Sequence, residues 1–146
     1  MIKEPEMKMN QPLGRRLSLI SKDFLEVLHS KLHHIELERN FYALILISKA
    51  KGDITQQELA TQLESDKVTI VRIIDYLTEK GYVTRSDHKE DRRKYCLTLT
   101  TKGEQEIFDI EEALFEVHNL CFKGLTEKEI ETFNKTLLVI QKNLKQ

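Results

Sequence analysis

The sequence has few prolines and glycines, which break regular structure, and few cysteines and no tryptophan. Its 146 residues include no tryptophan, two prolines, five glycines and two cysteines. This scarcity, together with 32% charged residues, excludes a collagen-like or low-complexity chain and favours a largely helical globular domain. The two cysteines lie far apart in the sequence and do not make a disulfide framework. A single domain in a reducing compartment is therefore expected.

Features that would place the chain in a membrane or an active site are also missing. The longest apolar run, residues 41–47, is far too short to cross a bilayer. The first dozen residues lack the apolar core of a signal peptide, so we expect a cytoplasmic protein with no membrane partner. The sequence has no phosphate loop, no nucleophile set near a histidine and no recognisable carboxylate pair. We therefore predict no enzyme activity and no cofactor.

The charge is balanced overall but uneven along the chain. The formal net charge is −1, yet residues 104–146 hold 9 acidic and 5 basic side chains, while residues 52–103 hold 9 of each. The excess acid is thus concentrated at the C-terminal end. Such a balance predicts modest non-specific affinity for nucleic acid, with discrimination resting on a few placed arginines.

Residues 55–100 have the pattern of a helix-turn-helix followed by a hairpin. Thr55 and Glu58 have the spacing of a capping box, which predicts a helix start. A second helix, about residues 67–80, is expected to begin after a cap at Asp66 and to end at Gly81. Two helices joined by so short a turn must cross steeply.

The outward face of the second helix carries the candidate DNA-reading residues. They lie on or beside its open face near the N-terminus: Lys67, Val68, Thr69, Val71 and Arg72. An arginine can bond guanine O6 and N7, and apolar groups can contact thymine methyl groups. The alternative is an ordinary solvated helix face, which exposed valines fit poorly. We interpret this face as a DNA-recognition surface.

The hairpin is predicted from two β-rich segments, residues 82–85 and 95–99, joined by a charged loop over 86–94. Tyr95, Leu97 and Leu99 alternate as in a half-buried strand. The candidate DNA contacts of this wing are Asp91, Arg92, Arg93 and Lys94. An arginine at a hairpin tip can enter a narrow minor groove, and Asp91 is close enough to accept a hydrogen bond from Arg93. A loop that is merely soluble is the alternative.

Several motifs together resemble the MarR family of bacterial winged-helix regulators. They are Gln56-x-Glu58-Leu59-Ala60, Asp66-Lys67-x-Thr69-x-x-Arg72, Glu79-Lys80-Gly81-Tyr82-Val83, Asp91-Arg92-Arg93 and Leu99-Thr100-x-x-Gly103. The resemblance implies a homodimer that binds a pseudo-palindromic operator, usually as a repressor released by a ligand or an oxidant. It also implies that Arg93 is the minor-groove arginine and Asp91 its orienting partner, and that Thr69 and Arg72 read the major groove. We add Gln56 as a candidate phosphate contact.

Two positions depart from the family's pattern. Val68 and Val71 replace residues that are commonly small and polar, so the operator's base preferences do not follow from the resemblance. Glu64 stands where the turn often has glycine, which predicts backbone strain in that turn.

Long apolar seams flank this region on both sides. The N-terminal seam runs from Leu13 to Ile35, and a second, nearly all-apolar helix is expected over residues 36–50. Toward the C-terminus, a helix from Thr100 or Thr101 should carry an apolar stripe that includes Cys121, and a capping box at Thr126 should open the last helix. One small head cannot cover all these seams, so we expect them to pair with a second copy of the chain.

The expected fold is therefore mainly α with a small β-hairpin wing. Within one domain spanning residues 1–146, we expect a winged helix-turn-helix over 53–100. Helical scaffold and dimerisation regions over 13–50 and 101–146 should flank it. The sequence identifies no residues for a small-molecule effector.

Three other functions are compatible with the sequence, two of them for a regulator of the same fold and one from another class. A zinc-responsive regulator would use four candidate ligands, namely His29, His33, His118 and Cys121. A thiol-responsive regulator would use Cys96 on a wing strand, although the family's sensing cysteine lies in the first helix, which here has none. From another class, the rival is a winged-helix module for protein–protein contact. Against zinc, Cys121 on an apolar stripe reads as a core residue.

Overall fold

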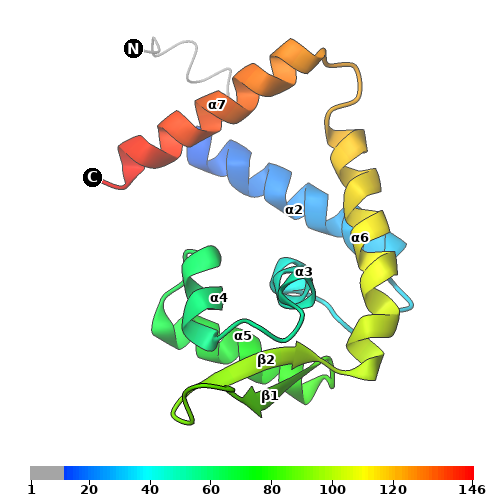
Figure 1. Cartoon of the computed structure of the whole chain (residues 1–146). Helices are drawn as coiled ribbons and strands as arrows, with labels where there is room; N and C mark the ends of the chain where they lie inside the picture. Colours follow the sequence, from blue (N-terminus) through cyan, green and yellow to red (C-terminus); the bar gives the residue numbers. More distant parts are fainter. Residues whose placement is uncertain (1–11) are drawn as a thin grey trace. The chain divides into compact units, whose positions relative to one another are not determined.

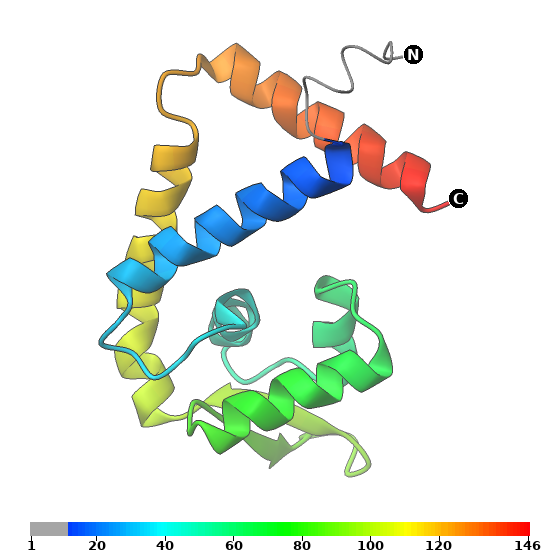
Figure 2. The ribbon, with the colours of Figure 1, turned by 180° about the vertical axis from the view of Figure 1, so that it is seen from behind.

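The computed structural model describes residues 12–146 and is mainly helical, with one antiparallel hairpin (Figures 1 and 2). The elements in chain order are α2 (Leu13–Lys31), α3 (Phe41–Ala50), α4 (Gln56–Gln62), α5 (Lys67–Glu79), β1 (Val83–Asp87), β2 (Tyr95–Leu99), α6 (Thr101–Cys121) and α7 (Glu127–Leu144). No helix within this part of the chain is long and apolar enough to cross a membrane.

The chain folds as two compact units. The first ends at Leu114 and contains the helix-turn-helix and the hairpin, and the second covers Phe115–Gln146. The chain enters the second unit through α6. The core of the first unit is built from large apolar side chains that are almost fully buried: Leu28, Leu44, Ile47, Ile54, Leu59, Ile70, Ile74, Leu77, Tyr82, Leu97 and Ile110.

Helix α3 is the central buried element of the first unit, as its apolar sequence predicts. Half of its residues are buried, and it packs against α4 and β2 (Figure 1). Its expected start near residue 36 was wrong, because the helix begins at Phe41. Asn40 precedes it in the left-handed conformation with φ of +66°, so the backbone cannot run helically from residue 36 into α3. Residues 32–40 form a connecting segment instead.

The helix-turn-helix has the caps that the sequence predicts. The Thr55 hydroxyl accepts from the Glu58 N–H at 3.2 Å, and the Glu58 carboxylate accepts from the Thr55 N–H at 2.8 Å. Asp66 caps α5 by accepting from the Thr69 N–H at 2.7 Å. Glu64 has φ of +51°, so the turn carries the left-handed residue expected there.

The hairpin pairs β1 with β2 from Val83 opposite Leu99 to Asp87 opposite Tyr95. The alternation expected for β2 is only partly correct, because Leu97 is buried but Tyr95 is exposed. Cys96 is buried as well. Thr55 forms a β-bridge with Cys96, and the Leu97 N–H donates to the Ile54 carbonyl at 2.8 Å. The chain at residues 54–55 therefore covers β2 on its other side at this point, and the simple alternation is broken there.

The second unit exposes much of its apolar surface. Helix α7 opens with the predicted capping box at Thr126 and Glu129 and has no buried residue. Phe122 and Phe133 contact each other with ring centroids 5.9 Å apart. The exposed large apolar residues of this unit are Phe115, Leu120, Leu125, Phe133, Leu138, Val139 and Leu144.

The stripe expected along α6 is buried over only part of its length. Ile110, Ala113 and Val117 are buried, whereas Cys121 is exposed. The interpretation of Cys121 as a core residue was therefore wrong for the single chain, because the burial of this helix stops before its last turn.

Candidate nucleic-acid interface

The N-terminal half of α5 presents an exposed face beside a buried stripe. Ile70, Ile74 and Leu77 are buried, which turns the remaining side chains outward. All the predicted reading residues on this helix are exposed: Lys67, Val68, Thr69, Val71 and Arg72. Val68 is 63% exposed, so a β-branched apolar side chain stands in water with no core role. Val71 is exposed as well, so two valines lie at the surface beside Lys67 and Arg72.

The start of α5 is held rigidly by Asp66. The hydrogen bond from the Thr69 N–H is the main cause that holds the pKa of Asp66 below its ordinary value. The carboxylate is thus ionised at neutral pH, where it also complements the helix dipole. Thr69 and its neighbours are therefore carried on a well-defined first turn.

A groove of about 480 Å³ lies between α4, α5 and the hairpin. Its lining residues are Thr55, Gln56, Gln57, Ala60, Lys67, Ile70, Val71, Arg85, Arg93, Lys94, Tyr95 and Leu97. Four of these carry a positive charge, and among the described residues that line the groove there is no carboxylate. A concave surface whose charged residues are all cationic attracts polyanions, and its field is focused by the low-dielectric walls.

The wing loop holds its arginine by local hydrogen bonds. The Asp91 carboxylate accepts from the Arg93 N–H at 3.0 Å and from the Arg93 Nε at 3.3 Å. These bonds, the backbone bond first, hold the pKa of Asp91 below its ordinary value. The Arg93 side chain is nevertheless 92% exposed, so the guanidinium is oriented at its base and free at its tip. The predicted Asp91–Arg93 bond is confirmed.

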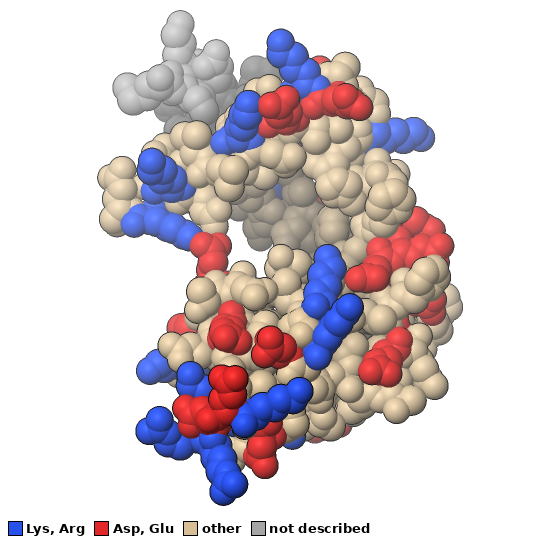
Figure 3. All heavy atoms as spheres, viewed as in Figure 1, with Lys and Arg blue, Asp and Glu red and all other residues tan. Residues whose placement is uncertain are grey.

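Basic and acidic side chains crowd together around the loop end of the hairpin (Figure 3). His88, which the sequence reasoning passed over, organises this loop from inside. Its Nδ1 accepts from the Glu90 N–H at 3.1 Å and from the Asp91 N–H at 3.0 Å. Histidine is not among the residues that typically mark turns, so the sequence alone did not indicate this role for His88.

Arg85 is a second residue that sequence reasoning missed. It lies on β1, lines the cationic groove, and donates from Nη2 to the Asp75 carboxylate on α5 at 2.9 Å. The pair joins α5 to β1 of the hairpin. A guanidinium has five N–H donors, so Arg85 keeps donors for another anion while it is paired. The two residues are ten apart on different elements, and no local pattern connects them.

Comparison with known proteins identifies the family. The family model described as "MarR family" matches residues 38–95. A solved structure of MarR is 32% identical, with 91% of this chain and 97% of that chain covered and a TM-score of 0.67. The chain belongs to the MarR family. A mutant MarR from E. coli, solved in complex with operator DNA, is 26% identical over 92% of this chain and 96% of that chain, with a TM-score of 0.76.

The fold comparison agrees with this assignment. The transcriptional regulator SlyA is 21% identical over 92% of this chain and 94% of that chain, with a TM-score of 0.80. The winged-helix fold predicted from the sequence is therefore confirmed, and the protein is a winged-helix transcriptional regulator of the MarR family.

In this MarR-family protein the predicted contacts fall into two groups. Gln56, Lys67, Val71, Arg93 and Lys94 meet in the cationic groove. The others lie outside the groove: Val68, Thr69, Arg72 and Arg92 are exposed, and Asp91 supports the wing loop from a half-buried position. The groove thus lies between the exposed face of α5 and the wing, and each of them contributes residues to its lining.

The three candidate histidine ligands have other contacts, and Cys121 is an exposed free cysteine. His29 contacts the Glu38 carbonyl through Nε2, and His33 contacts the Ser30 carbonyl through Nδ1 at 3.1 Å. The His118 ring contacts the Phe122 ring edge-to-face, with ring centroids 4.8 Å apart. Over residues 12–146, no group of three or more histidine, cysteine or acidic side chains is placed to hold a metal ion.

Proposed function

We propose that this MarR-family protein is a homodimer that binds a pseudo-palindromic operator in double-stranded DNA and represses transcription. A small-molecule effector releases it. The proposal is supported by the relative from E. coli that was solved with operator DNA. We propose a cytoplasmic location, where a DNA-binding regulator meets its operator.

The observation that carries the proposal is the exposed face of α5 beside a groove lined by Lys67, Arg85, Arg93 and Lys94. An α-helix fits the major groove of B-DNA, with its N-terminal residues toward the base edges. In that position Arg72 and Thr69 are the hydrogen-bonding readers, and Val68 and Val71 contact thymine methyl groups. Three of the groove's cations, Lys67, Arg85 and Lys94, face the sugar–phosphate backbone beside the helix, together with Gln56.

The wing extends the contact to the neighbouring minor groove. Arg93 is the inserted arginine, because it is oriented by Asp91 yet exposed at its tip. A narrow minor groove has the most negative potential, which attracts such a side chain. Arg92 and Lys94, next to it, neutralise phosphates on either side.

The dimer is proposed from exposed apolar residues outside the winged-helix region. Leu13, Leu17 and Ile20 on α2 are exposed, as is most of the apolar surface of the second unit. Large exposed apolar surfaces on soluble proteins commonly mark interaction sites, and we propose that a second copy of the chain covers this one. An isologous contact gives two-fold symmetry, which places two recognition helices about 34 Å apart on one face of the duplex.

Binding to DNA is tested by fluorescence anisotropy with a duplex selected from a random pool. We expect tight binding that weakens steeply with salt, because each phosphate neutralised contributes about −0.9 to the slope of log K against log salt. Roughly four phosphate contacts per subunit, from Lys67, Arg85, Arg92 and Lys94, give a slope near −7 for the dimer. A protein–protein module predicts no enriched sequence and weak, non-selective binding, and that result would overturn the proposal.

A further inference from the structure

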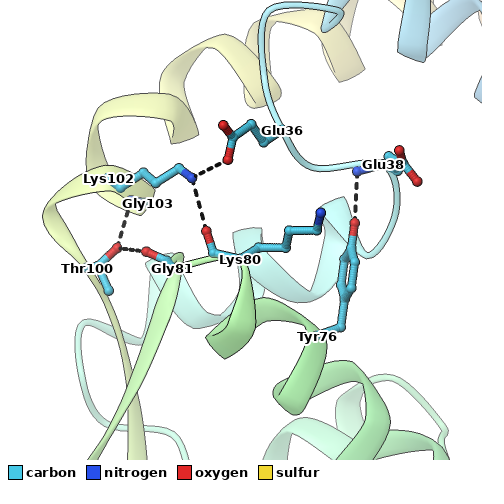
Figure 4. Close-up of polar contacts among 8 residues, drawn as sticks. All are labelled: Glu36, Glu38, Tyr76, Lys80, Gly81, Thr100, Lys102 and Gly103. Atoms are coloured by element: carbon cyan, nitrogen blue, oxygen red, sulfur yellow. Dashed lines mark hydrogen bonds and ion pairs between the residues drawn. The ribbon is translucent and has the colours of Figure 1, made fainter.

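Lys102, in the first turn of α6, contacts the C-terminal end of α5 and the segment before α3. Lys102 Nζ donates to the Glu36 carboxylate at 2.8 Å and to the Lys80 carbonyl at 3.0 Å (Figure 4). Its ammonium also lies 4.6 Å from the centroid of the Tyr82 ring. One side chain thereby joins three segments that are far apart in the sequence: the segment before α3, the end of α5 and the first turn of α6.

The backbone around Lys102 leaves little room for adjustment. The Thr100 hydroxyl donates to the Gly81 carbonyl at 2.5 Å and accepts from the Gly103 N–H at 3.1 Å (Figure 4). A Cβ atom at Gly103 would come within 2.6 Å of the Tyr82 carbonyl oxygen. The first turn of α6 therefore packs directly on the backbone that leads from α5 into the wing.

The segment over residues 32–40 holds α5 at a second point. The Glu38 N–H donates to the Tyr76 hydroxyl at 3.0 Å, and the Arg39 guanidinium lies 4.2 Å from the centroid of the Tyr76 ring. Buried Leu32, Ile35 and Leu37 anchor this segment in the core. The last turns of α5 thus contact both the segment over residues 32–40 and the first turn of α6. The ion pair between Glu36 and Lys102 joins that segment to α6.

We propose that Lys102 is a positioning residue for operator binding, acting together with Glu36. It fixes the direction of α5 relative to α6, and the chain enters the second unit through α6. In the dimer this direction sets the distance and angle between the two recognition helices. The inference rests on the proposed function, because only a dimer that reads two half-sites needs that distance to be fixed.

Two possible roles of the Glu36 charge predict opposite effects on DNA binding when that charge is neutralised. As a simple negative charge, Glu36 repels DNA, so its neutralisation should tighten binding. As the partner of Lys102, it holds the ammonium against the end of α5, where a cation also complements the helix dipole. Its neutralisation should then loosen the junction and weaken selective binding.

The experiment compares two duplexes. One is selected from a random pool by the wild-type protein, and the other is the same duplex with one base pair inserted between the half-sites. The spacing ratio is the affinity for the first divided by that for the second. The wild-type ratio should be about tenfold or more, because the insertion shifts and rotates one half-site. The variants are Lys102→Met and Glu36→Gln, each checked for a wild-type melting transition.

We expect both variants to lower the spacing ratio to half the wild-type value or less, and Lys102→Arg to keep it. The matched control is Lys49→Met on α3, which removes the same charge from an exposed position outside the predicted DNA contacts and the proposed dimer surface, and should leave the ratio unchanged. If either Lys102→Met or Glu36→Gln keeps more than half of the wild-type ratio, the positioning role is overturned. If the wild-type protein selects no duplex, the proposed function fails first, and that outcome is distinct from an unchanged ratio.

Discussion

Replacing Arg93 with alanine removes the guanidinium that the wing loop is built to present. The side chain is 92% exposed and donates one hydrogen bond, from Nε to the Asp91 carboxylate. Its loss therefore removes little packing. The backbone bond from the N–H of residue 93 to Asp91 does not need the side chain. We expect the variant to keep the wild-type fold and dimer.

The expected effect on operator binding is large. A single well-placed arginine at a DNA interface contributes about 1–3 kcal/mol, and the proposed dimer uses two. The loss of about 2–6 kcal/mol corresponds to a roughly 30- to 10⁴-fold weaker affinity, since 1.4 kcal/mol is a factor of ten. Arg93→Lys keeps the charge but not the planar fork, and should lie between the wild type and Arg93→Ala.

The assay is anisotropy on the selected duplex at fixed salt, with melting and sedimentation as checks on fold and dimer. The control is Lys89→Ala, which removes the same charge from the same exposed loop outside the predicted contacts. We expect a change below about threefold for Lys89→Ala. An Arg93→Ala affinity equal to that of the control would remove the wing from the mechanism.

Other predictions concern stability and pH. Gly103→Ala should lower the free energy of unfolding by about 1–3 kcal/mol, because its Cβ would meet a backbone oxygen at 2.6 Å. Gly14→Ala, with nothing within 4 Å, should be neutral or stabilising, and urea titration of both variants tests the contrast. Thr55→Ala should cost about 1 kcal/mol by the same measurement, because it removes one half of a capping box. Hydrogen bonds from Arg93 lower the pKa of Asp91, so their stabilising effect is full above the ordinary aspartate pKa of about 4 and is lost as pH falls through the lowered value. The amide NMR signal of Arg93 should thus stay constant from about pH 7 to 5 and shift only below about pH 4. A midpoint above pH 5 would contradict this assignment.

The features that sequence predicted best are local ones. The capping boxes at Thr55 and Thr126, the Asp66 cap and the Asp91–Arg93 bond each depend on residues two or three positions apart. Chain geometry alone brings such groups together, so spacing is enough to predict them.

The features that sequence missed depend on contacts between distant segments. Lys102 and Glu36 are 66 residues apart, and no periodicity relates them. The exposure of Cys121 and of Tyr95 likewise depends on which neighbours cover each element. The late start of α3 is a different kind of miss. Asn40 is one of the residues that tolerate the left-handed conformation, but the sequence does not show which of them adopts it.

The central claim is that two copies of this chain bind one duplex symmetrically. Sedimentation velocity of a labelled, selected duplex with excess protein measures that stoichiometry directly. We expect a complex containing two chains per duplex at the lowest protein concentration that gives binding, with no intermediate containing one chain. A stable complex of one chain with one duplex would contradict the account.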